Sequence, residues 1–204
     1  MKVIGLTGNI GCGKSTVARM LRGMGAATID LDAVARQIRS NDAEARDEIE
    51  RRFGTIEAKD LGRIVFADPR ALRDLEAILH PRVRNEVRAR LAELEEGGVG
   101  VAVVEGIKLL ESPLHDRCDT TWVVRCEVSD AVERLAVSRG MTEADARARL
   151  ANQSSQDEKV AAADEVIDGS ATLDETRSQV EAALARLLDG DRTVEQESPP
   201  DRIA

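Results

Sequence analysis

Short apolar runs alternate with amphipathic stretches along most of the 204-residue chain. The apolar runs predict strands, and the stretches between them show the helical repeat of apolar residues. Continuous apolar strands separated by helices are typical of a parallel sheet that is covered on both faces. The predicted strands are residues 2–6, 26–30, 99–105, 120–124 and 165–168. The pattern therefore predicts an α/β fold with a five-stranded parallel sheet flanked by helices.

Capping residues mark the start of several predicted helices. Ser155 and Thr172 are each followed three residues later by a glutamate, which is the capping-box spacing. Asp68 precedes a proline, which suits the first position of a helix. The last predicted helix carries an apolar stripe that we expect to pack on the core, formed by Leu173, Val180, Leu184 and Leu187.

Two intervals depart from simple strand–helix alternation. Residues 32–98 are far more than one crossover helix needs, and their pattern predicts a helical insert. A shorter insert near residues 140–155 is dense in arginine and acidic residues. The tail, residues 189–204, has almost nothing to bury, so we expect it to be disordered.

Composition excludes several classes of protein. The formal net charge of −9 argues against a general nucleic-acid binder, which needs a basic face. No apolar stretch approaches the roughly 18 residues of a membrane span, and the N-terminus enters the first predicted strand without a signal peptide. Cys12, Cys118 and Cys126 form neither a C-x-x-C pair nor a metal-site spacing. We therefore expect reduced thiols in a cytoplasmic protein.

Aromatic residues make up 1% of the chain. A bound base can therefore not rely on aromatic stacking, and aliphatic side chains or an arginine plane would have to hold it.

The segment from Gly8 to Ser15 matches the phosphate-binding pattern G-x-x-x-x-G-K-[ST] and lies between a predicted strand and a predicted helix. Its glycines allow the backbone N–H groups to form an anion nest. Lys14 would reach the β- and γ-phosphates of ATP, and the Ser15 hydroxyl would ligate Mg²⁺. The predicted nucleotide-binding residues are Asn9, Ile10, Gly11, Cys12, Gly13, Lys14, Ser15 and Thr16.

Acidic residues close two of the predicted strands, where open α/β sheets bind ligands. Asp32 could act as a general base toward an acceptor hydroxyl, or it could cap a helix that begins at Ala33. Glu105 could support Mg²⁺ or be a solvated strand end. The residues alone leave both alternatives open.

Basic side chains supply further candidates. Arg134 and Arg139 lie near the end of the helix after the fourth strand, where they could neutralise a transferring phosphoryl group. For Arg147 and Arg149 we favour a solvated helix face. His80 is followed by a proline and lies close to Arg84, so it could be structural or could belong to an anionic substrate site.

Several segments besides the P-loop form a pattern along the chain, namely residues 5–11, 29–32, 61–69, 75–84, 134–135, 139, 151–153 and 163–168. In this order and without large gaps over residues 2–188, they resemble the dephospho-coenzyme A kinase family. The P-loop is shared by many families, whereas the segments in the helical insert are specific.

This resemblance implies a kinase that transfers the γ-phosphoryl of ATP to the ribose 3′-hydroxyl of dephospho-CoA with Mg²⁺, the last step of CoA synthesis. It implies that Asp32 is the base, that Lys14 and Arg139 hold the moving phosphoryl group, and that Thr7 and His80 line the acceptor side with Arg84 close by.

The resemblance also implies a division of the chain into parts. The nucleotide-binding core would comprise residues 1–31, 99–138 and 156–188, the acceptor-binding insert residues 32–98, and the lid residues 139–155. The implied partners are ATP and dephospho-CoA, in a monomer or weak homo-oligomer without nucleic acid or membrane.

Several positions depart from the family pattern, among them a lost phenylalanine in residues 107–111 and Ala58 in place of an arginine. Lys108 replaces an apolar residue, Ala131 a glutamine and Gly169 an asparagine. These changes affect contacts to the substrates more than the catalytic groups. The main alternative is another small P-loop kinase that acts on a nucleoside monophosphate. A GTPase would need an N-K-x-D motif, which the sequence lacks, and an inactive scaffold would not need Lys14, Ser15, Asp32 and Arg139.

Overall fold

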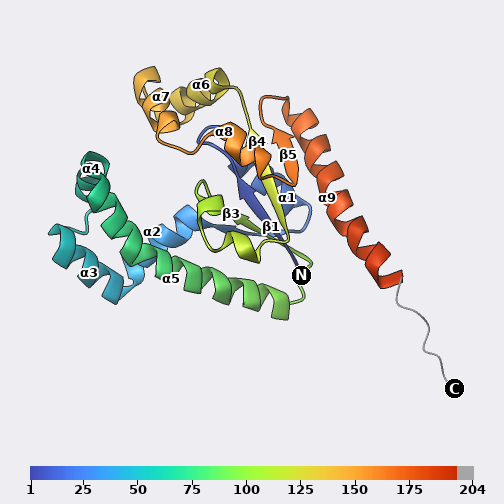
Figure 1. The fold of residues 1–204 in the computed structure, drawn as a ribbon, viewed down its shortest axis with the longest axis horizontal. Helices are drawn as coiled ribbons and strands as arrows, with labels where there is room; N and C mark the ends of the chain where they lie inside the picture. The colour runs from blue at the N-terminus through green and yellow to red at the C-terminus, as the bar shows by residue number, and fades with distance from the viewer. Residues whose placement is uncertain (197–204) are drawn as a thin grey trace. The chain divides into compact units, whose positions relative to one another are not determined.

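The computed structural model describes residues 1–196, and the remainder of the predicted tail, residues 197–204, lies outside the described residues. Five strands form one sheet in the order β2-β3-β1-β4-β5 (Figure 1). The strands are β1 (Lys2–Thr7), β2 (Ala27–Asp30), β3 (Val101–Glu105), β4 (Thr120–Arg125) and β5 (Glu165–Asp168). The predicted α/β fold with a five-stranded parallel sheet is confirmed.

Strand register places polar residues at matching ends of neighbouring strands. In the parallel pair β2–β3, Asp30 lies opposite Glu105, and in the parallel pair β4–β5, Arg125 lies opposite Asp168. All four residues are the last of their strands, so each pair lies at the carboxyl ends of its own two strands. The third strand begins at Val101 rather than at residue 99, because Gly98 has a positive φ of 73° in the preceding turn.

The chain divides into two compact units, of which the first contains residues 1–5 and 25–119. Its helices are α2 (Leu31–Asn41), α3 (Ala43–Phe53), α4 (Ala58–Ala67) and α5 (Pro69–Glu96), so the predicted insert is helical. Two short 3₁₀ helices, η1 (Leu109–Glu111) and η2 (His115–Arg117), follow β3.

Two apolar clusters hold this unit together. Helices α2 and α5 pack on each other and on the strands through Val34, Ile38, Val83 and Val87. A second cluster, centred on Ile49, joins α3, α4 and α5 (Figure 1).

Helix α5 runs without a break through Pro81, although proline lacks the N–H group that an interior helical position needs. Next to it, the Arg82 guanidinium donates to the Ile78 carbonyl oxygen at 2.8 Å and to a Glu48 carboxylate oxygen at 2.9 Å. The arginine thus ties the proline-containing turn of α5 to α3.

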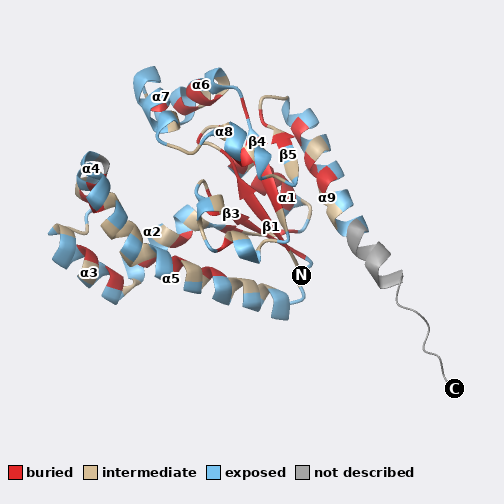
Figure 2. Cartoon of the chain, in the orientation of Figure 1, coloured by how far each residue is buried: buried red, intermediate tan, exposed pale blue. Residues whose placement is uncertain are grey.

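The second unit contains residues 6–24 and 120–204. Its helices are α1 (Lys14–Gly23), α6 (Val128–Arg139), α7 (Glu143–Ala151), α8 (Gln156–Ala161) and α9 (Leu173–Gln196). In this unit α9 packs on β5 and α1, and Figure 2 shows the buried positions concentrated in the strands. The division into core, insert and lid that the family resemblance implies remains a prediction.

The predicted helix starts are present. Ser155 and Glu158 form a reciprocal capping box at α8. The Thr172 N–H donates to Glu175 at 2.9 Å, and the Thr172 hydroxyl accepts from the Glu175 N–H at 3.3 Å. The Asp68 side chain caps α5 by accepting from the Arg70 N–H at 2.8 Å.

Two expectations about the last helix were wrong. Leu173 is 67% exposed, because it occupies the first position of α9, and the fully buried face is formed by Thr176, Val180 and Ala183 instead. The helix continues to Gln196, so the beginning of the expected disordered tail is helical. Within the described residues, no helix is long and apolar enough to cross a membrane.

Candidate functional site

The P-loop runs from the end of β1 to the start of α1, as the sequence motif predicts. Gly8 and Gly11 have φ values of 141° and 82°, which L side chains rarely adopt. A Cβ atom on Gly8 would lie 2.2 Å from the Val124 carbonyl oxygen, and one on Gly11 would lie 2.8 Å from that of Ala131. The loop therefore requires glycine both for its curvature and for its close packing against β4 and α6.

The first turn of α1 supplies the charged and polar groups of the loop. Lys14 is 9% exposed, and its Nζ atom donates to the Asn9 carbonyl oxygen at 3.2 Å. The Lys14 ammonium group therefore lies against the P-loop backbone that precedes α1. Ser15 is exposed, and the Thr16 N–H donates to the Gly13 carbonyl oxygen at 2.9 Å. No acidic side chain occupies this first turn, so the positive end of the helix dipole is not neutralised there.

Polar side chains from α8 and the turn before it hold the P-loop. The Gln153 Oε1 atom accepts the Ile10 N–H at 3.0 Å, and the Lys159 Nζ atom donates to Asn9 Oδ1 at 2.6 Å. Lys159 is only 2% exposed. The sequence motifs did not predict that either residue contacts the P-loop. The signal available in the sequence was a polar residue at every third position, Gln153, Gln156 and Lys159. This spacing did not identify their distant partners in the P-loop.

The expectation of reduced thiols was wrong for two of the three cysteines. Cys12 and Cys126 form a disulfide, with their Cα atoms 5.1 Å apart and a sequence separation of 114. The spacing of the cysteines does not indicate this bond, because the two residues come together only when the P-loop packs against the end of β4. Cys118 is free.

Arg134 links the P-loop to the loop after β5. Its guanidinium donates to the Gly11 carbonyl oxygen at 3.5 Å and to the Gly169 carbonyl oxygen at 2.7 Å. Position 169 must be glycine here, because a Cβ atom would lie 2.1 Å from the Cys12 carbonyl oxygen.

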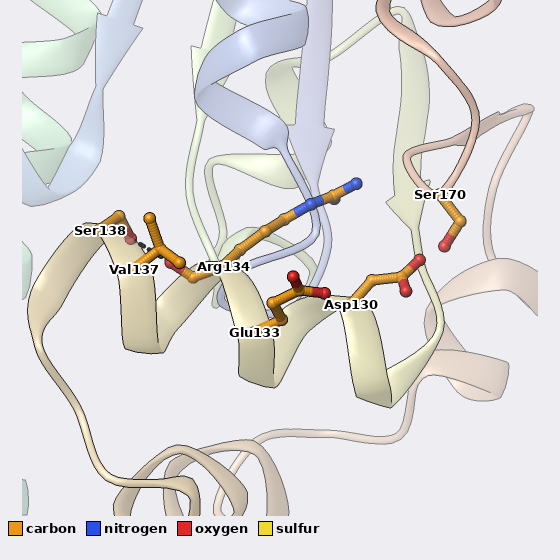
Figure 3. Close-up of a pocket in the computed structure, with 6 residues that line it drawn as sticks. All are labelled: Asp130, Glu133, Arg134, Val137, Ser138 and Ser170. Carbon is orange, nitrogen blue, oxygen red and sulfur yellow. Dashed lines mark hydrogen bonds between the residues drawn. The ribbon is translucent and has the colours of Figure 1, made fainter.

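A pocket of about 490 Å³ lies beside Arg134. Figure 3 shows the Arg134 side chain extending from α6, with the Ser170 hydroxyl beside the Asp130 carboxylate. The residues that line the pocket are Asp130, Glu133, Arg134, Val137, Ser138 and Ser170.

The remaining arginines of α6 and α7 differ in their surroundings. Arg139 is the last residue of α6 and is exposed, and its side chain makes no hydrogen bond or ion pair with other described residues. Arg147 pairs with Glu143 at 2.9 Å on the exposed face of α7, as the interpretation of a solvated helix face predicts.

In the first unit, the two neighbouring aspartates have different surroundings. Asp30 caps α2, since its side chain accepts from the Ala33 N–H at 3.0 Å. Asp32 lies within the first turn of the helix and is exposed. The alternative in which Asp32 caps the helix was therefore wrong, because the helix begins at Leu31 and not at Ala33.

The loop after β3 lies against the start of α2. A Cβ atom on Gly106 would lie 2.7 Å from Leu31 Cδ1, the residue before Asp32. Glu105 immediately precedes this contact and lies opposite Asp30 in the sheet. The segments that carry Asp30, Asp32 and Glu105 thus lie near one another at the carboxyl ends of β2 and β3.

His80 and Arg84 are four residues apart on α5, which places them on the same face of the helix. Glu76 lies one turn before His80, and the Lys108 Nζ atom lies 2.7 Å from its carboxylate oxygen. Burial lowers the pKa of His80, Glu76 opposes this effect, and Lys108 and Arg84 lower the pKa further. The imidazole is therefore neutral at neutral pH, and Lys108 is ion-paired.

The predicted site residues thus fall into two sets. The second unit holds the P-loop residues, Thr7, which is buried at the end of β1, and Arg139. The first unit holds Asp32, His80 and Arg84. That the two sets act on one pair of substrates remains a prediction.

Comparisons with known proteins identify the family. The family model described as dephospho-CoA kinase matches residues 2–175. A dephospho-CoA kinase of Symbiobacterium thermophilum is 40% identical over 94% of this chain and 83% of its own length. One from Geobacter sulfurreducens is 40% identical over 91% of this chain and 98% of its own length.

Solved structures agree on the fold. A crystal structure of a Thermus thermophilus protein is 33% identical, with a TM-score of 0.79, over 91% of this chain and 97% of that one. Dephospho-CoA kinase from Campylobacter jejuni has a TM-score of 0.63 at 23% identity, over 94% of this chain and 100% of its own, and supports the fold alone. The match over most of the sequence, together with the P-loop geometry, shows that this chain belongs to the dephospho-CoA kinase family.

Proposed function

We propose that this chain transfers the γ-phosphoryl group of ATP to the 3′-hydroxyl of the ribose of dephospho-CoA, which gives CoA and ADP. The observation that supports ATP as the phosphoryl donor is the closely packed P-loop. Lys14 and the start of α1, whose helix dipole is not neutralised by an acidic side chain, both face this loop. Family membership supports the choice of acceptor.

The P-loop would bind the triphosphate through its backbone N–H groups and through Lys14. Because Gln153 holds the Ile10 N–H and Lys159 holds the Asn9 side chain, the other N–H groups of the loop are oriented before ATP arrives. An oriented loop stabilises charge that develops on the transferring group without having to reorganise.

The residues present fit a nucleotide-bound Mg²⁺. The described residues contain no cluster of three or more His, Cys, Asp or Glu side chains that could bind a metal on its own. Mg²⁺ commonly takes few protein ligands together with substrate phosphates. The exposed Ser15 hydroxyl at the start of α1 suits this role. When bound, Mg²⁺ would neutralise charge on the β- and γ-phosphates.

The adenine of ATP would occupy the pocket beside Arg134. A pocket of this kind suits a chain with few aromatic residues, since the Arg134 guanidinium plane and the Val137 side chain are available to cover the base. The carboxylates of Asp130 and Glu133 and the Ser170 hydroxyl can accept hydrogen bonds from an exocyclic amino group.

Asp32 would accept the proton of the acceptor hydroxyl as that oxygen attacks the γ-phosphorus atom and ADP leaves. Its side chain is exposed, and the capping role belongs to its neighbour Asp30. His80 and Arg84 would bind the anionic acceptor, and Arg139 would contact the transferring phosphoryl group. We further propose that the enzyme works in the cytoplasm as a monomer or weak homo-oligomer.

A coupled assay of ADP release tests the proposal. The assay compares dephospho-CoA with AMP, CMP and dTMP as acceptors in the presence of ATP and Mg²⁺, and CoA is identified by mass spectrometry. We expect ADP release with dephospho-CoA and CoA as the product. Release with a monophosphate instead would favour the alternative, a nucleoside monophosphate kinase with the same core.

A further inference from the structure

The disulfide connects the centre of the P-loop to the end of a strand. Cys12 lies between Gly11 and Gly13, whose φ values are 82° and 99°. Cys126 directly follows β4. The two side chains are 1% and 4% exposed. Their Cα separation of 5.1 Å lies within the usual range for disulfides, so the bond fits the curled loop as folded.

Cys126 is fixed independently of this bond. Gln156 of α8 accepts the Cys126 N–H at 3.0 Å through Oε1 and donates to the Cys126 carbonyl oxygen at 3.1 Å through Nε2. The same Oε1 atom lies 3.6 Å from Cys12 Sγ. The disulfide therefore ties the loop to a point that α8 already holds in place.

The disulfide lies in the part of the P-loop whose glycines allow the backbone the most conformational freedom. Glycine loses more backbone entropy on ordering than other residues do, and Cys12 is flanked by glycine on both sides. A covalent anchor at this position removes part of that freedom before a ligand binds, which improves affinity through pre-organisation.

We propose that Cys126 is a positioning residue for nucleotide binding: its bond to Cys12 holds the P-loop in the form that presents its N–H groups to phosphate, so that affinity for ATP depends on the oxidation state of this pair. The inference rests on the proposed function, since it takes ATP as the ligand of the loop.

The redox step needs a small disulfide, such as oxidised glutathione, as oxidant. One cysteine thiolate attacks the small disulfide and releases one thiol, which leaves a mixed disulfide on the protein. The second cysteine then attacks the protein sulfur of the mixed disulfide and releases the second thiol. Two protein thiols are oxidised, and one small disulfide is reduced to two thiols. Because both protein sulfurs are buried, the exchange requires a local opening of the loop and is slow.

Cys118 provides a matched control. Burial and the neighbouring Asp119 raise the pKa of its thiol to about 12, so it stays protonated at neutral pH. It is free and lies in the other unit, on the turn before β4. Replacing it changes the thiol count without touching the P-loop.

The experiment measures ATP binding by calorimetry in two states of the wild-type protein. One sample is treated with oxidised glutathione and the other with dithiothreitol, and intact mass confirms the loss or gain of two hydrogen atoms. We expect reduction to weaken ATP binding by about threefold to tenfold. The Michaelis constant for dephospho-CoA should be unchanged. Reoxidation should restore the affinity.

Two variants separate positioning from simple stabilisation. Cys126→Ser should bind ATP as the reduced wild type does in either buffer, and Cys118→Ser should keep the full redox dependence. Equal ATP affinity in both verified states, even with a lower melting temperature on reduction, would overturn the proposal, as would failure of the disulfide to form. If neither state bound ATP, the proposed nucleotide site itself would be wrong.

Discussion

The Lys159 ammonium lies 2.6 Å from the Oδ1 atom of Asn9, and the lysine is 2% exposed. A buried lysine is rare unless it is paired, because removing its charge from water is costly. Its position on α8 therefore commits the Asn9 side chain to one orientation within the P-loop.

Replacing this lysine should affect both folding and binding. We expect Lys159→Met to lower the free energy of unfolding by about 1.5–3 kcal/mol, since it removes a hydrogen bond to a charged donor. ATP affinity should fall as well, because Asn9 loses its anchor. Urea unfolding and calorimetric titration with ATP measure the two effects.

Lys108→Met is the matched control for this change. Lys108 is 54% exposed in its ion pair with Glu76, and exposed ion pairs contribute less than about 1 kcal/mol. Equal losses of stability in the two variants would contradict the structural role assigned to Lys159.

The neighbouring aspartates allow a second test. Asp32→Asn should lower turnover at least about 100-fold, because general base catalysis is lost, while ATP affinity is retained. Steady-state kinetics with dephospho-CoA and ATP measure the change. Near-normal turnover would remove Asp32 from the proposed mechanism.

The control for Asp32 is the residue that caps the same helix. Asp30→Asn should keep turnover close to that of the wild type, since asparagine is also a good cap. Asp30→Ala should cost about 1 kcal/mol of stability through loss of the cap. A stability loss in Asp32→Asn larger than that in Asp30→Ala would indicate that Asp32 is structural.

His80 should titrate below the usual histidine range. Because burial lowers its pKa in the folded state, the unfolded chain binds more protons as the pH falls from about 6.5 toward the lowered value. The contribution of His80 to stability is therefore present above pH 6.5 and is lost as the pH falls through that interval. An NMR titration, assigned with His80→Gln, measures the pKa.

Two substitutions should move the His80 pKa in opposite directions. Lys108→Met removes a cause that lowers the pKa, so the pKa should rise. Glu76→Gln removes the cause that raises it, so the pKa should fall further. A shift of both variants in one direction would show that the Lys108–Glu76 pair does not control the imidazole.

Gly169 offers a test of packing behind the P-loop. A Cβ atom at this position meets the Cys12 and Arg125 carbonyl oxygens at 2.1 and 3.0 Å. We expect Gly169→Ala to cost about 1–3 kcal/mol and to weaken ATP binding through the displaced loop. Thermal unfolding and ATP titration measure both effects.

Gly23→Ala is the control for added volume. Gly23 ends α1, and a Cβ atom there has nothing within 4 Å. Alanine is favoured over glycine in a helix, so this variant should be as stable as the wild type or slightly more stable. A stability loss at position 23 as large as that at 169 would show that the observed cost is not specific to the P-loop.

Local sequence patterns predicted the fold well because strands, helix caps and the P-loop depend on residues that are neighbours along the chain. The β5 bounds and the Ser155 capping box agree with the prediction. The predictions that failed concern contacts between segments far apart in sequence, or the exact residue at which a helix begins. The disulfide of Cys12 and the hydrogen bond of Lys159 join segments far apart in sequence, and the role of Asp30 depends on a helix that starts two residues early.

Arg134 and Arg139 lie on the same helix, α6. Arg134 is fixed by two backbone carbonyl oxygens, and five residues of helix rise about 7.5 Å between the two positions. Residues five apart in an α-helix project about 140° apart around its axis, so Arg134 and Arg139 point to different sides of α6. The contacts that fix Arg134 therefore set where the helix ends and where the backbone of Arg139 lies, whereas the exposed Arg139 side chain can still change its orientation.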